Sequence, residues 1–272
     1  MNGPPTARTS ADSVYEVLAL RYGTRTGSRA EIYLNHGIYG EPDSPLDMDY
    51  YVWVARNHHR TVVIDTGFSR AAGARRLRTA LASPVEALRR FGARPEQGPL
   101  IVITHAHYDH IGNLAAFDQS EVVIARAEFD FWTGPYARRA QFAHSAEPEE
   151  TAHLAEIHRQ GRTTLVDHRA TVAPGIEVLV VGGHTPGQSV VLVDTPGGQA
   201  VLASDSLHYY EELERDRPFA FVADLPAMYR GFDLLAELAS GPGRVLVPGH
   251  DPEVARRFDA VRGAEGLAYR IA

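Results

Sequence analysis

A repeated arrangement of apolar strand and polar loop constrains the fold of this chain more than any other feature of its sequence. Short apolar runs of strand length end abruptly in loops that carry histidine or aspartate. These runs cover residues 61–64, 100–103, 177–181, 200–203 and 244–247. In the same order, the loops that follow them begin with Asp65, with Thr104 and His105, with Gly182 to His184, with Ser204 and Asp205, and with Pro248 to His250. Sheet-based enzymes build sites in this way, with reactive residues on the loops of a rigid scaffold.

Two residue types are missing, and their absence limits the chemistry of such a site. The 272-residue chain contains no cysteine, and all 27 basic residues are arginine. Disulfides, thiolate–zinc sites, iron–sulfur clusters, Schiff bases and lysine general bases are therefore excluded. The net charge of −7 argues against a nucleic-acid partner, because such a protein needs a basic surface to displace phosphate counterions. Carboxylate, imidazole, hydroxyl and guanidinium chemistry remains.

The order of patterns along the chain predicts one domain. Residues 1–12 are rich in Pro, Thr and Ser and are expected to form a flexible tail, and residues 13–272 the domain. We expect a strand over residues 30–34, helical structure over 69–92, and an inserted helical and loop segment at about 127–169. No segment has the pattern of a signal peptide or a membrane span, so the sequence predicts a cytoplasmic protein without a membrane partner.

The stretch from Thr104 to Asn113, THAHYDHIGN, carries the strongest chemical signal. Alternate side chains of an extended chain share a face, so His105, His107 and Asp109 converge, while His110 lies next to them as the chain turns helical. Imidazole and carboxylate groups at this spacing suit a metal ion of the zinc type. The alternative is a dense cluster of surface histidines.

Three further residues, His184, Asp205 and His250, each follow one of the other strands. Taken singly, each has an ordinary explanation as a loop histidine or as a turn-capping aspartate. Taken together with the first stretch they complete seven nitrogen and oxygen ligands, enough for two metal ions that share one bridging carboxylate. Glycines beside these residues suit backbone that turns sharply next to ions.

This set of residues, His-x-His-x-Asp-His at 105–110 followed in order by His184, Asp205 and His250, resembles the metallo-β-lactamase superfamily. The resemblance extends over about residues 14–262. It implies an α+β fold of the αββα sandwich type, with two mixed β-sheets flanked by helices and metal ions at one edge. It also implies that the first ion is held by His105, His107 and His184, the second by Asp109, His110 and His250, and that Asp205 bridges both.

Within the superfamily, length and layout are most similar to the N-acyl homoserine lactonase branch, which acts in quorum quenching, and to the related 4-pyridoxolactonase type. The resemblance implies two divalent ions per chain, most simply Zn²⁺, and a catalytic role for Asp109. Lactonases of the best-known kind carry a tyrosine three residues after the bridging aspartate, where this chain has His208. Either His208 or the adjacent Tyr209 is therefore expected to contact the substrate carbonyl.

These features predict a metal-dependent hydrolase that opens the ester bond of a small lactone. A water between two divalent ions is acidified towards a pKa of about 7, which gives a metal-bridging hydroxide as the nucleophile. The alternatives are another ester, such as a bicyclic lactone or a phosphotriester, and an iron-dependent oxygenase on the same fold. The expected partner is a small-molecule lactone or ester, and the sequence is compatible with a homodimer. Aromatic residues that can line the substrate cleft are Trp132, Tyr136, Phe142, Phe219, Phe221 and Tyr229.

Overall fold

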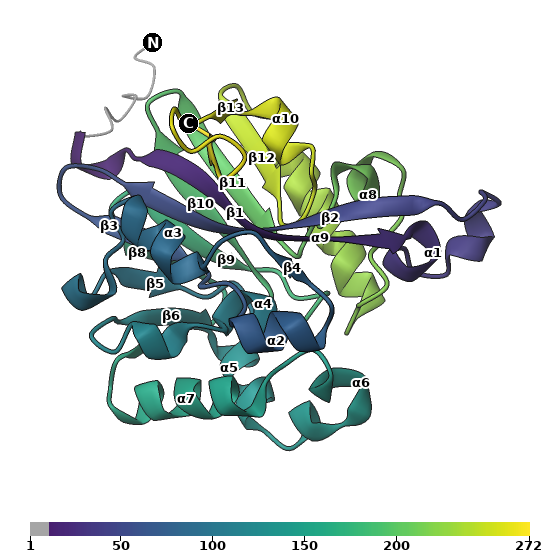
Figure 1. Ribbon diagram of the computed structural model, residues 1–272, viewed down its shortest axis with the longest axis horizontal. Coiled ribbons are helices and arrows are strands. Elements are labelled where there is room, and N and C mark those ends of the chain that lie inside the picture. Colours follow the sequence, from purple (N-terminus) through teal and green to yellow (C-terminus); the bar gives the residue numbers. More distant parts are fainter. Residues whose placement is uncertain (1–10) are drawn as a thin grey trace, which may run out of the picture.

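Two β-sheets packed face to face form the centre of the molecule, as Figure 1 shows for the computed structural model, which describes residues 11–272. The larger sheet runs in the order β13 (Asp259–Ala260), β14 (Ala268–Arg270), β1 (Glu16–Ser28), β2 (Pro45–Arg56), β3 (Thr61–Ile64), β5 (Leu100–Val102), β6 (Val122–Ala125) and β7 (Thr163–Val166), with β4 (Thr79–Ala80) paired to β1. The smaller sheet runs in the order β12 (Arg244–Pro248), β11 (Gly198–Ser204), β10 (Ser189–Thr195), β9 (Ile176–Val180) and β8 (Arg169–Ala173). Both sheets are mixed, since β3, β5, β6 and β7 pair in parallel in the first and β11 with β12 in the second.

Alternation along the strands explains why the sheets are covered on both faces. In β1, Val17 and Ala19 point into the core between the sheets, whereas Leu18 and Leu20 point to the outer face of the larger sheet. All four are fully buried. A strand that is apolar on both faces needs a partner layer on each side, so helices must cover the outer face.

Helices supply these outer layers, and the predicted αββα sandwich is confirmed. The helices that pack on the larger sheet are α2 (Arg70–Arg75), α3 (Pro84–Arg90), α4 (Tyr108–Ile111), α5 (Arg126–Thr133) and α7 (Pro148–Arg159), with the short α6 (Ala140–Ala143) beside them. The smaller sheet is covered by α8 (Tyr210–Glu214) and α9 (Leu225–Ala239), while α10 (Val254–Arg257) packs at the edge of the inter-sheet core. Among the helices of residues 11–272, none is long and apolar enough to cross a membrane.

The strand predicted for residues 30–34 is wrong, because this region begins with the short helix α1 (Arg29–Ile32). Ser28 accepts a hydrogen bond from the backbone N–H of Glu31, and the Glu31 carboxylate accepts one from the N–H of Ser28. This reciprocal pair is a capping box, which satisfies two backbone donors and starts a helix. The Ser-x-x-Glu spacing indicates the start of a helix, but the apolar residues that follow it favoured a strand in the sequence analysis.

Two other boundaries differ from the sequence expectation. The helical stretch expected over 69–92 is interrupted by β4, which extends the larger sheet by pairing with β1. Of the expected tail, residues 1–10 lie outside the described part of the chain. Asp12, at the end of the expected tail, contacts the domain. Its carboxylate lies 2.8 Å from His59 and its carbonyl oxygen accepts a hydrogen bond from Asn57.

Candidate metal centre

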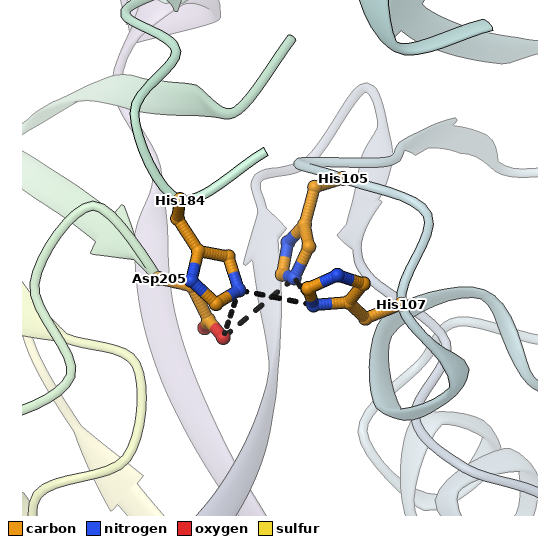
Figure 2. A group of neighbouring side chains, drawn as sticks. All are labelled: His105, His107, His184 and Asp205. Atoms are coloured by element: carbon orange, nitrogen blue, oxygen red, sulfur yellow. Dashed lines mark hydrogen bonds and ion pairs between the residues drawn. The ribbon is translucent and has the colours of Figure 1, made fainter. Parts of the chain in front are cut away.

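The predicted metal ligands all lie together, at the end of the sandwich where the strands deliver their polar loops. They form two buried groups whose ligand atoms lie within 4.8 Å of one another in each group. The first group consists of His105, His107, His184 and Asp205, shown in Figure 2, and the second of Asp109, His110 and His250. The grouping follows the division between two ions that the family resemblance implies.

Asp205 lies between the two groups and presents one carboxylate oxygen to each. Its Oδ2 lies 3.6 Å from His105 Nε2 and 3.3 Å from His184 Nε2. Its Oδ1 lies 3.3 Å from His110 Nε2 and 3.1 Å from His250 Nε2. One carboxylate therefore faces the histidines of both groups.

Most of the imidazoles are oriented through their second ring nitrogen. In each case Nδ1 faces an oxygen acceptor, which leaves Nε2 turned towards the centre of the site. The acceptors are the carbonyl oxygen of Phe221 for His184 (2.8 Å), the carbonyl oxygen of Asp49 for His250 (2.7 Å) and the carboxylate of Asp65 for His110 (2.7 Å). Metal-ligating histidines in proteins are held in the same way, because such contacts fix the tautomer and the ring angle.

The ring nitrogens of the candidate ligand histidines are arranged to bind a metal ion, and not to form hydrogen bonds with one another. His107 Nδ1 lies 3.1 Å from His105 Nε2 and 3.0 Å from His184 Nε2, so several ring nitrogens converge on one point (Figure 2). Burial lowers the pKa of His105 and His107 well below the ordinary value and that of His184 to about 3. Neutral imidazoles offer lone pairs, and a cation is the natural partner of lone pairs that converge in a buried site.

Backbone geometry makes room for this arrangement. A Cβ atom added at Gly249 would lie 2.8 Å from Asp205 Oδ1, so a side chain there would displace the Asp205 carboxylate. Asp65 adopts the left-handed region with φ 61°, which is uncommon for a residue other than glycine. In this position it accepts hydrogen bonds from the N–H and the hydroxyl of Thr104 as well as facing His110. Asp65 therefore ties the first ligand loop to the start of α4.

The structure separates the two candidates for the carbonyl contact. His208 lines the cavity over the ligands, its Nε2 lies 3.1 Å from Asp205, and its ring stacks on Phe219 with centroids 3.7 Å apart. Burial alone would lower the pKa of His208, but the nearby carboxylates of Asp205 and Glu212 outweigh it and raise the pKa to about 9. The hydroxyl of Tyr209 instead donates to the carbonyl oxygen of Asp47, and Tyr209 does not line the cavity.

One residue that matters for the site was missed by sequence reasoning. Glu128 of α5 is fully buried, and its carboxylate accepts hydrogen bonds from the N–H of Ala106, the N–H of Gly187 and the indole N–H of Trp132. It thus joins the loop that carries His105 and His107 to the loop that follows His184. The only signal in the sequence was a carboxylate on the same helix face as an aromatic residue four positions later.

A cavity of about 420 Å³ lies over the ligands, and it is walled in part by aromatic side chains. Of the aromatic residues predicted for a cleft, Phe219 and Phe221 line it. Trp132 is buried behind it, with its ring 5.4 Å from that of His107. Tyr136 is exposed and lies outside the cavity. The cavity gives a small molecule direct access to the ligand groups.

Comparison with known proteins agrees with this geometry. The family model of the metallo-beta-lactamase superfamily matches residues 47–250. An N-acyl homoserine lactonase from Bacillus sp is 29% identical over 173 residues, which cover 63% of each chain, so this chain spans less than two thirds of the length of that curated relative.

Solved structures share the fold over a larger part of the chain. A quorum-quenching N-acyl homoserine lactone lactonase superposes with a TM-score of 0.74 at 20% identity, covering 91% of this chain and 97% of the other. AidC, a dizinc quorum-quenching lactonase in complex with a product, superposes with a TM-score of 0.69 at 18% identity, covering 89% of this chain and 92% of the other. Fold, ligand geometry and family model agree: the chain belongs to the metallo-beta-lactamase superfamily.

Proposed function

We propose that this protein is a dinuclear metal-dependent hydrolase that opens the ester bond of a small lactone. The observation that carries the proposal is the position of Asp205, whose two oxygens face the two histidine groups separately. Lactones are the favoured substrate class because the curated relative from Bacillus sp is named as an N-acyl homoserine lactonase. In that case the protein would act in quorum quenching.

Zinc is the metal we propose for both positions. The ligands are imidazole nitrogens and carboxylate oxygens, and the chain has no thiolate to offer. Zn²⁺ binds such ligands readily, and a site with positions left open to water is typical of catalytic zinc. The pair of cations would supply an acidified water and would polarise the substrate carbonyl.

The chain's own residues would perform the remaining steps. Asp109 belongs to the second group and is 7% exposed, so its carboxylate can also orient the attacking water and accept its proton. The water oxygen bonds to the carbonyl carbon, the ring C–O bond breaks, and Asp109 returns the proton to the leaving alkoxide. His208, at the wall of the cavity, would donate a hydrogen bond to the oxygen on which negative charge develops. The product is a hydroxy acid.

A pH-indicator assay tests the proposal, because the acid formed by ring opening releases a proton. The zinc-loaded protein is assayed near pH 7 in weak buffer against N-hexanoyl homoserine lactone, a bicyclic lactone and a phosphotriester. We expect acidification with the homoserine lactone, its loss after chelation and its recovery when zinc is restored. If the protein hydrolyses only the bicyclic lactone or only the phosphotriester, that compound class would replace the homoserine lactones as the proposed substrate.

Metal analysis supplies the second arm of the test. Two zinc ions per chain without hydrolysis of any ester in the panel would overturn the proposal. One iron per chain with consumption of oxygen would favour the oxygenase alternative. The exposed carboxylate variant Asp118→Ala serves as a control, since Asp118 lies at the surface and is not a ligand.

A further inference from the structure

Arginine side chains form part of the wall of the cavity over the metal ligands. Arg25 projects from β1, and Arg76 and Arg78 come from the connection between α2 and β4. The chain as a whole carries a net charge of −7, so a local group of guanidinium ions at its ligand cavity runs against the overall charge balance. Such a charge is available to a ligand only where no carboxylate of the protein already pairs with it.

Arg76 is neutralised within the protein. It forms an ion pair with Glu147, donates a 2.8 Å hydrogen bond to the carbonyl oxygen of His144, and lies over the ring of Tyr108 at 4.1 Å. These contacts tie α2 to the connection between α6 and α7. Arg76 therefore has a structural role, and its guanidinium group is held by the protein itself, although Glu147 also pairs with Arg75.

Arg25 and Arg78 have no such partner. Within residues 11–272, neither has a carboxylate oxygen within ion-pair distance. Arg78 donates from Nε to the hydroxyl of Tyr108 at 2.9 Å, which leaves its terminal nitrogens available. The Nε of Arg25 is buried and has no hydrogen-bond partner among the described residues.

The strand register brings these two charges together. β1 and β4 are antiparallel, with Gly23 paired to Ala80 and Thr24 paired to Thr79. Arg25 follows Thr24 along β1 and Arg78 precedes Thr79 of β4, so both arginines lie at the same end of this pairing. Like charges on neighbouring strands destabilise one another, and an anion between them would remove this cost.

The remaining acidic group at this wall does not cancel both charges. Glu31 lines the cavity, but its carboxylate already accepts the N–H of Ser28 in the capping box of α1. Asp109 and Asp205 also line the cavity, and Asp109 acts on Arg78 through its charge, but both are candidate ligands whose charge a metal ion would balance. Apart from these ligands, two guanidinium groups face one carboxylate, which leaves a surplus of one positive charge. That surplus suits a monoanion such as a carboxylate.

We propose that Arg25 and Arg78 form a subsite for a carboxylate on the substrate, so that the preferred substrate is a lactone with a negatively charged group remote from the ester. This inference rests on the proposed lactonase function. Guanidinium binds carboxylate through strong charge-assisted hydrogen bonds, which give both affinity and orientation. The subsite would select carboxyl-terminated side chains over aliphatic ones of the same shape.

Matched substrates test the subsite. N-succinyl homoserine lactone is compared with N-(4-methylpentanoyl) homoserine lactone, in which two methyl groups replace the two carboxylate oxygens, and malonyl and glutaryl analogues vary the spacer. We expect kcat/KM to be at least roughly tenfold higher for one of the anionic lactones than for its neutral match, mainly through KM. The preference should fall at least tenfold in Arg78→Met and in Arg25→Met, and Arg78→Lys should retain part of it.

Arg94→Met is the matched control variant. Arg94 is exposed at the opposite end of the larger sheet, beside the starts of β3 and β5, so its loss should leave the preference unchanged. If Arg78→Met fails to fold, Arg25→Met carries the same test, because Arg25 donates no hydrogen bond that supports the described structure. An equal preference for neutral and anionic lactones in the unaltered protein would overturn the subsite.

A binding measurement separates failure of the subsite from failure of the proposed function. The cyclopentyl amides of succinic acid and of 4-methylpentanoic acid contain no ester, and calorimetry with the zinc-loaded protein gives their Kd values. We expect the succinic acid derivative to bind at least tenfold more tightly, with an advantage that shrinks as salt increases. Arginine-dependent binding without lactone hydrolysis would reject the proposed function alone. Lactone hydrolysis without an anionic advantage in binding would reject the subsite alone.

Discussion

The ligand loops and the helical segment α5–α7 both enclose the metal centre, but they contribute to it in different ways. The segments that follow the strands supply every candidate ligand, Asp109 and His110 from the short helix α4 and the others from loops. The helical segment supplies no candidate ligand, yet Glu128 of α5 fastens two of those loops together. One region thus provides the donor atoms and the other holds their spacing. Substitutions in the two regions should therefore have effects of different size and kind.

The largest effect is expected from loss of the carboxylate that faces both ligand groups. Asp205→Ala removes the contacts to five histidines, four of which are candidate ligands, and we expect the zinc content to fall by at least one ion per chain. Hydrolysis should fall by more than about 100-fold, which exceeds the usual loss when a residue only supports a ligand. Elemental analysis and kcat on the same preparation check both expectations. A fully metallated, active variant would show that Asp205 does not bridge two metal ions.

His208 tests the wall of the cavity rather than the ligand loops. His208→Phe keeps the stacking on Phe219 but removes the donor, so we expect kcat to fall by about 100-fold while KM and zinc content stay nearly constant. His208→Tyr restores a donor on an aromatic ring and should recover part of the rate. If the Phe and Tyr variants have equal kcat values, hydrogen bonding from this position does not contribute.

Glu128 tests the helical segment directly. Glu128→Gln preserves volume but replaces one acceptor oxygen by an NH₂ group, which cannot accept from both Ala106 and Gly187. We expect zinc affinity to fall by about 10–100-fold, as for other residues that orient ligands. Competition with a chromogenic chelator measures this affinity. Unchanged zinc affinity in a folded variant would show that the ligand loops keep their spacing without α5.

The same division explains how much could be predicted from sequence. Local spacing predicted that His105, His107 and Asp109 share one face of an extended chain. His105 and His107 do lie in one ligand group, but Asp109 lies in α4 and belongs to the other group, because the chain has already turned helical there. Asp205 was found because its strand end resembled the others. The carboxylate of Glu128 could not be found in this way, since its partners lie 22 and 59 residues away and only folding brings them together. The fold could be predicted through the motif, whereas the capping box of α1 was hidden by an apolar run.

The smallest effect, and the one that best isolates the helical segment, is expected at Glu150 in α7. Burial, together with the neighbouring Glu147 carboxylate, raises the pKa of Glu150 from 4.5 to about 8, and its Oε2 has no hydrogen-bond partner among the described residues. The folded protein therefore keeps this proton up to about pH 8, whereas the unfolded chain releases it near pH 4.5. The free energy of unfolding must fall across that window as pH rises.

Glu150→Gln imitates the protonated form and escapes this loss. The difference in unfolding free energy between this variant and the unaltered protein should be near zero at pH 4.5 and should grow in favour of the variant as pH rises. Above pH 8 it should level off at about 2 kcal/mol, because partial exposure of Glu150 reduces the full effect. Urea unfolding at pH 4.5, 6.5 and 8.5 measures the difference. Zinc affinity should change much less than in Glu128→Gln, because the side chain of Glu150 forms no hydrogen bond with a ligand loop among the described residues and acts on Asp109 only through its charge. A stability difference independent of pH would mean that Glu150 is ionised in the folded protein. The helical segment would then hold a charged carboxylate at a largely buried position.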